Sequence, residues 1–279
     1  MRIGLLGGSF DPIHDGHVLI AKTVKDALNL DEIWFIPVLN NPFKEHGAAS
    51  GEHRIKMIEI ATRKLENMKV CDIELKGDPN VKSYTYHTLL KLKDLYPNDE
   101  FYYIIGADQV EKFDRWFEAK RISELVSLVC LGRKGYEFSK ENILAFNMTE
   151  IDYEPIKASS TAIREGNFKN TDKKVIEYFT MNGLYLESIV ASYMSSKRYI
   201  HTKSMAELAV EIAMENGIDP KKAYVAGMLH DITKALDGPL QLTLCAEYGK
   251  VLDEFSENNP KTLHALTGSL VAKQIFGEN

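Results

Sequence analysis

The chain opens with a short apolar run, residues 2–6, that is followed at once by Gly7-Gly8 and then by S-F-D-P-I-H-D-G-H up to His17. An apolar run of this length bounded by glycines predicts a buried strand that opens an α/β domain. Because glycine has no Cβ, the backbone can turn sharply here and a phosphate can approach the amides. The opening therefore favours a fold whose first loop, including Ser9 and Phe10, binds an anion.

Two histidines, His14 and His17, stand three residues apart at the end of this loop. If a helix begins near Gly16, this spacing places both imidazoles side by side at its amino terminus. Free amides and the positive end of the helix dipole converge at the same point and stabilise an anion there. The alternative is that the glycines only make a tight turn and that the histidines are surface residues.

Composition and charge narrow the classes of protein. The 279 residues are 44% hydrophobic and 27% charged, which is typical of an ordinary soluble protein, and the net charge of −6 argues against nucleic-acid binding as the main activity. Cys71, Cys130 and Cys245 are too few and too far apart for a disulfide framework, so we expect reduced thiols. We see neither a leader-like start nor eighteen consecutive apolar residues, and we therefore expect a cytoplasmic protein with no membrane partner.

Apolar runs alternate with helical periodicity through the first half of the chain. The expected strands are 2–6, 33–38, 70–75, 101–105 and 126–131, and the expected helices are 18–28, 52–66, 84–95 and a short one closing at 122–125. This alternation predicts β-α-β units and a doubly wound, Rossmann-like parallel sheet.

In such a sheet, ligands bind beyond the carboxyl ends of the strands. Arg133 follows one of these ends and could meet a phosphate. Lys44 follows another, where a solvated surface lysine is the alternative to a role in the site. Gly106 permits a close approach after another strand, and the carboxylate of Asp108 can accept hydrogen bonds from a ribose or an adenine amine. Trp116 could stack on a flat ring, or it could belong to the core.

Three consecutive hydroxyl residues precede an arginine in Ser159-Ser160-Thr161-Ala162-Ile163-Arg164. They could cap a helix, which needs only one hydroxyl, or they could cradle a triphosphate together with the Arg164 guanidinium.

The run from Gly7 to His17 resembles the signature of the nucleotidyltransferase superfamily with the H-x-G-H motif, and specifically its nicotinate mononucleotide adenylyltransferases. Three further blocks carry the same resemblance: S-Y-T at 83–85, G-A-D-x-x-x-x-F-x-x-W at 106–116 and S-S-T-A-I-R at 159–164. This chain departs from the family pattern at His87, where an acidic residue is usual, and at Ala158, where isoleucine is common. The resemblance covers a domain of residues 1–187.

The resemblance implies transfer of AMP from ATP to nicotinate mononucleotide, which releases pyrophosphate, with Mg²⁺ held mainly by the triphosphate. It implies that His14 and His17 act on the α-phosphate. The residues implied for ATP are Gly7, Gly8, Ser9, Phe10, Gly106, Asp108, Arg133, Ser159, Ser160 and Arg164, and those implied for the second substrate are Lys44, Tyr84, Thr85 and Trp116. A sister transferase for nicotinamide mononucleotide or phosphopantetheine, and a nucleotide-binding module without activity, are the alternatives. The presence of both histidines argues against the last of these.

The remaining residues, 188–279, have helical periodicity throughout, with an apolar stripe between Ile200 and Ala213 and an N-cap and first-turn proline at Asp219-Pro220. Four side chains suit a divalent metal: His201, His230, Asp231 and His264. An incidental His-Asp pair is the alternative.

This part resembles the start of an all-helical HD-superfamily phosphohydrolase of the kind that hydrolyses diadenosine tetraphosphate symmetrically, which implies a divalent metal such as iron. A complete member continues with further histidines and a closing aspartate. The chain reaches Asn279 without them, so the sequence leaves open whether this part is a fragment of such a domain or a degenerate one. The sequence leaves the oligomeric state open, a homo-oligomer included.

Overall fold

The computed structural model describes residues 1–39, 49–78, 83–132 and 140–277. The chain forms two compact units, residues 1–160 and residues 161–279, and each is considered by itself. The boundary at 187/188 expected from the sequence stays a prediction.

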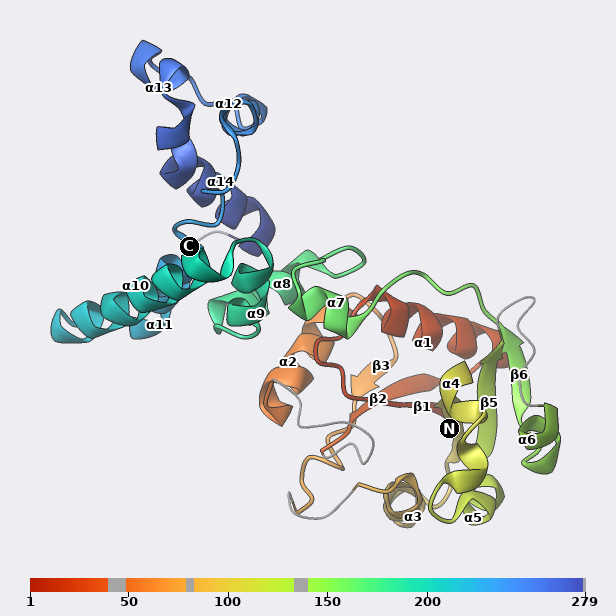
Figure 1. Ribbon diagram of the computed structural model, residues 1–279. Helices are drawn as coiled ribbons and strands as arrows, with labels where there is room; N and C mark the ends of the chain where they lie inside the picture. The colour runs from red at the N-terminus through yellow and green to blue at the C-terminus, as the bar shows by residue number, and fades with distance from the viewer. Residues whose placement is uncertain (40–48, 79–82, 133–139, 278–279) are drawn as a thin grey trace. The chain divides into compact units, whose positions relative to one another are not determined.

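The first unit is built on a six-stranded parallel sheet in the order β3-β2-β1-β4-β5-β6 (Figure 1). The strands are β1 Arg2–Gly8, β2 Glu32–Pro37, β3 Met68–Val70, β4 Glu100–Ile105, β5 Ser127–Gly132 and β6 Thr149–Asp152. From β1 the chain runs outward through β2 and β3, and it then returns to the other side of β1 with β4. This order confirms the doubly wound sheet predicted from the sequence.

Helices cover both faces of this sheet, with α1 on one side and α3 and α5 on the other (Figure 1). The helices of the first unit are α1 Asp15–Leu28, α2 Gly51–Thr62, α3 Thr85–Leu95, α4 Ala107–Val110, the 3-10 turn η1 Phe113–Arg115, α5 Ala119–Leu125 and α6 Lys140–Ala145. Alternate residues of β1 bury on opposite faces, and Ile3 and Leu5 join a core cluster with Leu89 of α3 and Ile122 of α5.

Two details at the edges of the sheet differ from the sequence prediction. The expected strand 70–75 is wrong after Val70, because the chain leaves the sheet once the Cys71 amide has bonded to the Phe35 carbonyl at 2.8 Å, and residues 73–76 form a turn. The short strand β6 was not predicted, since only Ile151 of its four residues is apolar and no apolar run marks it.

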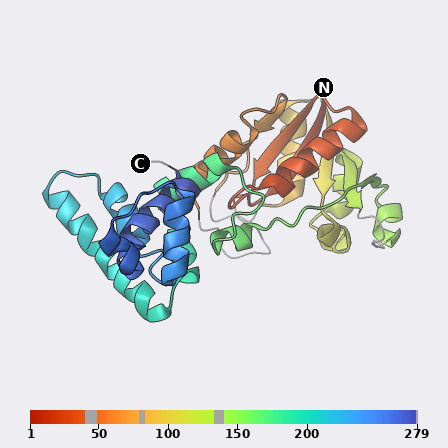
Figure 2. The ribbon, with the colours of Figure 1, turned by 90° about the horizontal axis from the view of Figure 1, so that it is seen from above.

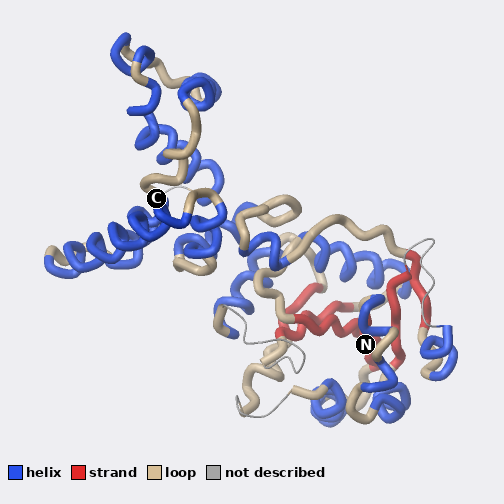
Figure 3. Tube along the Cα trace, in the orientation of Figure 1, coloured by secondary structure: helices blue, strands red, loops and turns tan. Residues whose placement is uncertain are grey.

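The second unit is helical, and in Figure 3 all strands fall outside it; Figure 2 shows its helices from another side. Its elements are α7 Ser160–Arg164, which begins at the last residue of the first unit, α8 Lys173–Met181, α9 Leu186–Ser192, α10 Ser196–Glu215, α11 Pro220–Leu229, α12 Gly238–Glu247, α13 Glu254–Asn258, the 3-10 turn η2 Pro260–Leu263 and α14 His264–Phe276. None of the described helices in either unit is both long and apolar enough to cross a bilayer.

The apolar stripe of α10 lies mostly on the solvent side of the helix. Met205, Leu208 and Ile212 are 42%, 46% and 51% exposed. The buried side of α10 carries small residues instead, and Ala206 is packed against Gly227 of α11 so closely that a Cβ on Gly227 would lie 2.5 Å from the Ala206 Cα. Periodicity predicted the helix correctly, but α10 packs by the close approach of two backbones.

Candidate active site and candidate metal centre

The predicted nucleotide loop lies where the order of the strands reverses. β1 has β2 on one side and β4 on the other, so the loops after β1 and β4 leave the same edge of the sheet in different directions. Gly7 and Gly8 end β1, and Gly106 follows β4. A crevice at this reversal point is where doubly wound sheets bind their ligands.

Gly7 and Gly8 lie where there is little space for a side chain. A Cβ on Gly7 would lie 2.9 Å from the Tyr103 hydroxyl, and a Cβ on Gly8 would lie 3.0 Å from the Phe10 ring. Phe10 is buried with a left-handed backbone (φ 49°), and its ring packs edge-on against His17 at 5.0 Å between centroids. The Phe10 ring therefore packs against Gly8 and His17 and supports the loop between them.

His14 and His17 lie together at the amino terminus of α1, as their spacing predicts. Their rings stack with centroids 3.7 Å apart and planes at 18°, and His14 is the N-cap residue. Gly16 between them is required by this arrangement, since a Cβ there would lie 3.0 Å from Nδ1 of His14 and 3.4 Å from the Cβ of Ala158.

The electrostatic state of the pair follows from its surroundings. Burial lowers the pKa of His14 to about 4, so this imidazole is neutral near pH 7 in the free protein. Nδ1 of His17 lies 3.2 Å from the backbone nitrogen of His14 and accepts its hydrogen. The neutral ring of His14 can therefore stack closely on that of His17 beside the helix amides.

Arg54 is a site residue that was not among the residues selected from the sequence. It is 6% exposed, and its guanidinium NH1 donates to the carbonyls of Ser9 at 2.9 Å and of Val38 at 2.8 Å. It thus ties the nucleotide loop to the end of β2. The pair His53-Arg54 at the start of a helix was the available signal, but a buried arginine bonded to backbone carbonyls cannot be told from a surface one by sequence.

The start of the hydroxyl run lies against the same loop. The Ser160 hydroxyl donates to the Pro12 carbonyl at 2.9 Å, and Ala158 faces Gly16 of α1. Residues 158–160 of the first unit therefore pack against the segment that carries the histidine pair, and their role in binding a triphosphate stays a prediction. Arg164 belongs to the second unit, where its NH2 lies 3.4 Å from the Thr161 hydroxyl, so its approach to the loop stays a prediction.

The residues predicted for the second substrate are on α3 and after β4. Tyr84 is the N-cap residue of α3 and its ring lies 4.9 Å from that of Phe117, while the Thr85 hydroxyl lies 3.4 Å from that of Tyr103. Burial raises the pKa of Tyr103 to about 12, so its hydroxyl stays protonated.

Trp116 packs against the core, which is one of the two roles weighed for it, and its stacking on a ligand ring stays a prediction. Its ring is half-buried beside the core, 5.1 Å from Phe113 and 6.2 Å from Tyr103 between centroids. Its Nε1 is buried and has no hydrogen-bond partner within the described part of the chain. Asp108, by contrast, is exposed in the short helix α4 after β4. Lys44 and Arg133 lie outside the described residues.

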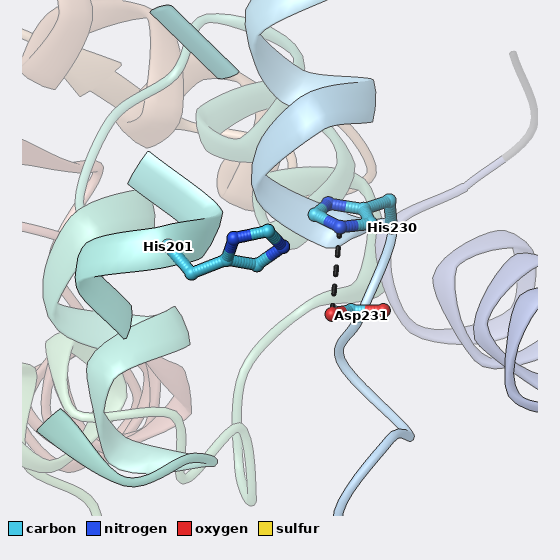
Figure 4. Close-up of side chains that lie close together, drawn as sticks. All are labelled: His201, His230 and Asp231. Atoms are coloured by element: carbon cyan, nitrogen blue, oxygen red, sulfur yellow. Dashed lines mark ion pairs between the residues drawn. The ribbon is translucent and has the colours of Figure 1, made fainter. Parts of the chain in front are cut away.

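In the second unit, the structure brings three of the four predicted metal ligands into one cluster. His201 extends from α10 toward His230 and Asp231 at the end of α11 (Figure 4). One ligand atom from each of these residues lies within 4.8 Å of the other two. The two histidines are exposed and Asp231 is buried, which is the arrangement of a site open to solvent on one side.

The donor chemistry of this cluster fits a divalent metal. Nδ1 of His230 donates to the Gly227 carbonyl at 2.6 Å, which leaves the lone pair on Nε2, 3.5 Å from Oδ2 of Asp231. A histidine whose second nitrogen is held by a carbonyl is typical of metal ligands, because the bond fixes the tautomer and the ring orientation.

The fourth predicted ligand, His264, lies on the other side of Asp231. Its Nε2 is 3.6 Å from Oδ1 of Asp231 and 2.9 Å from Nζ of Lys234. Asp231 also pairs with Arg198 at 3.0 Å and with Lys234 at 3.6 Å. Positive charge therefore gathers around this carboxylate, as a site for phosphates requires.

A buried network of hydroxyls and an amide, which the sequence argument missed, fixes the segments that carry Asp231 and His264. Thr233 donates to the His264 carbonyl at 2.9 Å and lies 2.9 Å from the Thr267 hydroxyl. Gln241 donates to the Thr233 carbonyl at 2.8 Å and accepts a bond from Thr267. These three side chains are 3% exposed or less.

Comparison with protein families matches residues 5–166 to the cytidylyltransferase-like family and residues 198–279 to the HD domain. A probable nicotinate-nucleotide adenylyltransferase/Ap4A hydrolase of Mycoplasma genitalium is 30% identical over 277 residues, which are 99% of this chain and 77% of that protein. A probable nicotinate-nucleotide adenylyltransferase of Oceanobacillus iheyensis is 43% identical over 164 residues, which are 59% of this chain and 83% of that protein.

The fold of the first unit recurs in a solved structure. Plasmodium falciparum nicotinic acid mononucleotide adenylyltransferase complexed with NaAD has a TM-score of 0.55 at 21% identity, over 66% of this chain and 97% of that one. With the parallel sheet, its glycine loop and the histidine pair, these matches lead to one assignment. The chain belongs to the cytidylyltransferase-like family, among relatives named nicotinate-nucleotide adenylyltransferases, and carries an HD domain in its carboxyl-terminal part.

Proposed function

We propose that this protein transfers AMP from ATP to nicotinate mononucleotide, forming nicotinate adenine dinucleotide and releasing pyrophosphate. The observation that carries the proposal is the stacked pair His14 and His17 at the amino terminus of α1, directly beyond the glycines that end β1. The names of the relatives support the same reaction.

The chemistry needs positioning and charge stabilisation more than it needs a base. The phosphate of nicotinate mononucleotide is an anion at neutral pH, and its oxygen attacks the α-phosphorus of ATP while the bond to the bridging oxygen of pyrophosphate breaks. His17 would donate from Nε2 to this phosphate, since its Nδ1 is already an acceptor. His14 and the first amides of α1 would oppose the charge that develops beside it.

Mg²⁺ would come to this site with the triphosphate. Among the described residues, the one group of three metal-ligating side chains is in the second unit, so the nucleotide itself would supply most of the ligands. The ion would neutralise phosphate charge. Gly7, Gly8, Ser9, Phe10, Gly106, Asp108, Ser159 and Ser160 are proposed for ATP from their places around the reversal point, with Arg133 and Arg164 proposed from the sequence pattern alone.

We further propose that the pyridine nucleotide binds between α3 and the segment after β4. Tyr84, Thr85 and Trp116 border that space, and Lys44 joins the proposal from its sequence pattern. The unpartnered Nε1 of Trp116 and the aromatic ring of Tyr84 suit a flat ring that carries a polar substituent.

A direct assay tests the main proposal. The protein is incubated with ATP, Mg²⁺ and either nicotinate or nicotinamide mononucleotide, and dinucleotide and pyrophosphate are both measured. We expect equal amounts of the two products and a clear preference for the nicotinate form. Pyrophosphate without dinucleotide, or a preference for the nicotinamide form, would contradict the proposal.

The second unit supports a second candidate function, the metal-dependent hydrolysis of diadenosine tetraphosphate to two ADP. The specific observation is the cluster of His201, His230 and Asp231, with His264, Lys234 and Arg198 around Asp231. A divalent ion such as iron would supply Lewis-acid chemistry there, while Lys234 and Arg198 would bind phosphate oxygens. Protein loaded with Fe²⁺ or Mn²⁺ should release ADP, whereas release no faster than in buffer would remove this activity from the chain.

A further inference from the structure

Glu74 follows β3, and its side chain meets α3 inside the first unit. Its Oε1 accepts the hydroxyl of Thr88 at 2.7 Å, and Thr88 is 7% exposed on α3. Burial raises the pKa of Glu74, and the Thr88 hydroxyl, the Ser83 hydroxyl and the Leu39 backbone amide act against that rise. One carboxyl group thus interacts with the end of β2, with the segment before α3 and with α3 itself.

Thr85, three residues before Thr88 and on the same face of α3, connects this helix to the nucleotide loop through Tyr103. The Thr85 hydroxyl lies 3.4 Å from that of Tyr103, and the Tyr103 hydroxyl lies 2.9 Å from where a Cβ on Gly7 would be. One face of the start of α3 is therefore bonded to Glu74 through Thr88 and contacts Tyr103, which packs under Gly7, through Thr85. The start of α3 carries Tyr84 and Thr85, the residues proposed for the pyridine nucleotide.

We propose that Glu74 and Thr88 are positioning residues that fix the first turn of α3, so that Tyr84 and Thr85 meet the pyridine nucleotide in the orientation that binds it. The inference rests on the proposed adenylyltransferase function. It predicts a selective effect: loss of the Glu74 to Thr88 bond weakens the use of nicotinate mononucleotide while the use of ATP, for which no residue of α3 is proposed, changes little. A purely structural bond would instead lower stability without separating the two substrates.

The chain offers a matched control for this test. Thr62 at the end of α2 is also a buried threonine, 5% exposed, whose hydroxyl donates to the Ile58 carbonyl at 2.8 Å. Thr88→Val and Thr62→Val therefore remove the same hydroxyl from the same kind of environment, and only the first removes a bond to Glu74. Thr88→Ser keeps the hydroxyl and serves as the rescue variant.

The experiment measures KM for each substrate, kcat and the thermal midpoint of the full chain for the wild type, Thr88→Val, Thr88→Ser, Thr62→Val and Glu74→Ala. We expect Thr88→Val to raise KM for nicotinate mononucleotide about fivefold, the effect of losing one hydrogen bond of about 1 kcal/mol. KM for ATP should stay within about twofold, Thr88→Ser should restore the wild-type value, and Thr62→Val should lower only the thermal midpoint.

Glu74→Ala should raise KM for nicotinate mononucleotide at least as much as Thr88→Val, because it removes the bond to Thr88 together with the interactions with Ser83 and Leu39. Adding Thr88→Val to Glu74→Ala should change this KM little further, because the bond between the two residues is already lost. The inference is overturned if Thr88→Val raises both KM values equally or changes only stability. Should Glu74→Ala fail to fold, the three threonine variants decide the question alone. A wild type that forms no dinucleotide would refute the proposed function, whereas failure of this inference appears only in an active protein.

Discussion

Nδ1 of His17 accepts the backbone hydrogen of His14 across 3.2 Å, which fixes the remaining proton of neutral His17 on Nε2. Nε2 is therefore the ring nitrogen of His17 that we propose as the donor to a phosphate bound beyond β1. A phosphate oxygen at that point would receive a hydrogen bond from Nε2 in addition to those from the helix amides.

The first prediction concerns the role of this donor. His17→Ala should lower kcat more than tenfold, a loss of over about 1.4 kcal/mol of transition-state stabilisation. His17→Gln, whose amide reaches the position of Nε2, should retain more activity than His17→Asn, whose amide reaches only the position of Nδ1. Pyrophosphate release measures both, and equal turnover of the wild type and His17→Ala would remove His17 from the mechanism.

The second prediction is a loss of stability in mild acid caused by His14. Its pKa is about 4 in the folded protein against 6.5 in the unfolded chain, so the unfolded state binds more protons between these values. Stability is therefore complete above pH 6.5 and falls as the pH drops toward 4, by roughly 2 kcal/mol between pH 7.5 and pH 5.

Urea unfolding at several pH values checks this contribution. His14→Gln, which cannot titrate, should have a smaller loss than the wild type over the same interval. Identical pH profiles for the two proteins would show that His14 is not the group responsible. Phosphate or ATP should reduce the loss in the wild type, because an anion beside His14 favours its charged form.

Sequence patterns predicted the sheet and the places of the chemistry because both depend on short, local signals. The apolar runs at β1, β4 and β5 and the glycines after them require no knowledge of distant residues. The stacking of His14 on His17 also follows from a local rule, since residues three apart share a helix face.

What the sequence could not provide depends on contacts between distant segments. The bond from Arg54 to the Ser9 carbonyl depends on how α2 packs beside the loop, so the sequence could not predict it. The bond between Glu74 and Thr88 likewise depends on the position of α3. The exposure of the apolar stripe on α10 also depends on a contact between distant segments. The close approach of Gly227 to Ala206 decides which side of α10 is buried.

The third prediction concerns metal binding to the second unit. Asp231→Asn should abolish the rise in thermal midpoint that Mn²⁺ gives the wild type, because the buried carboxylate is central to the cluster. Glu207→Gln, an exposed charge on the same helix as His201, is the matched control and should keep the full rise. A metal response that survives in Asp231→Asn would place the ion elsewhere in the chain.

The fourth prediction concerns the packing of α10 on α11, on which the metal cluster depends. Gly227→Ala would place a Cβ 2.5 Å from the Cα of Ala206, and since backbone atoms cannot move aside alone, the two helices must separate. Overpacking of this kind costs about 1 to 3 kcal/mol, which exceeds the gain of up to about 1 kcal/mol in helix propensity. The variant should therefore unfold at lower temperature and bind Mn²⁺ more weakly, since His201 and His230 are on the separated helices.

Gly268→Ala in α14 is the control, because its Cβ would meet its nearest neighbour, the His230 carbonyl, at an ordinary 3.4 Å. Calorimetry of both variants decides the matter: equal thermal midpoints would mean that α10 and α11 tolerate the added methyl group, and that the short contact does not set their spacing.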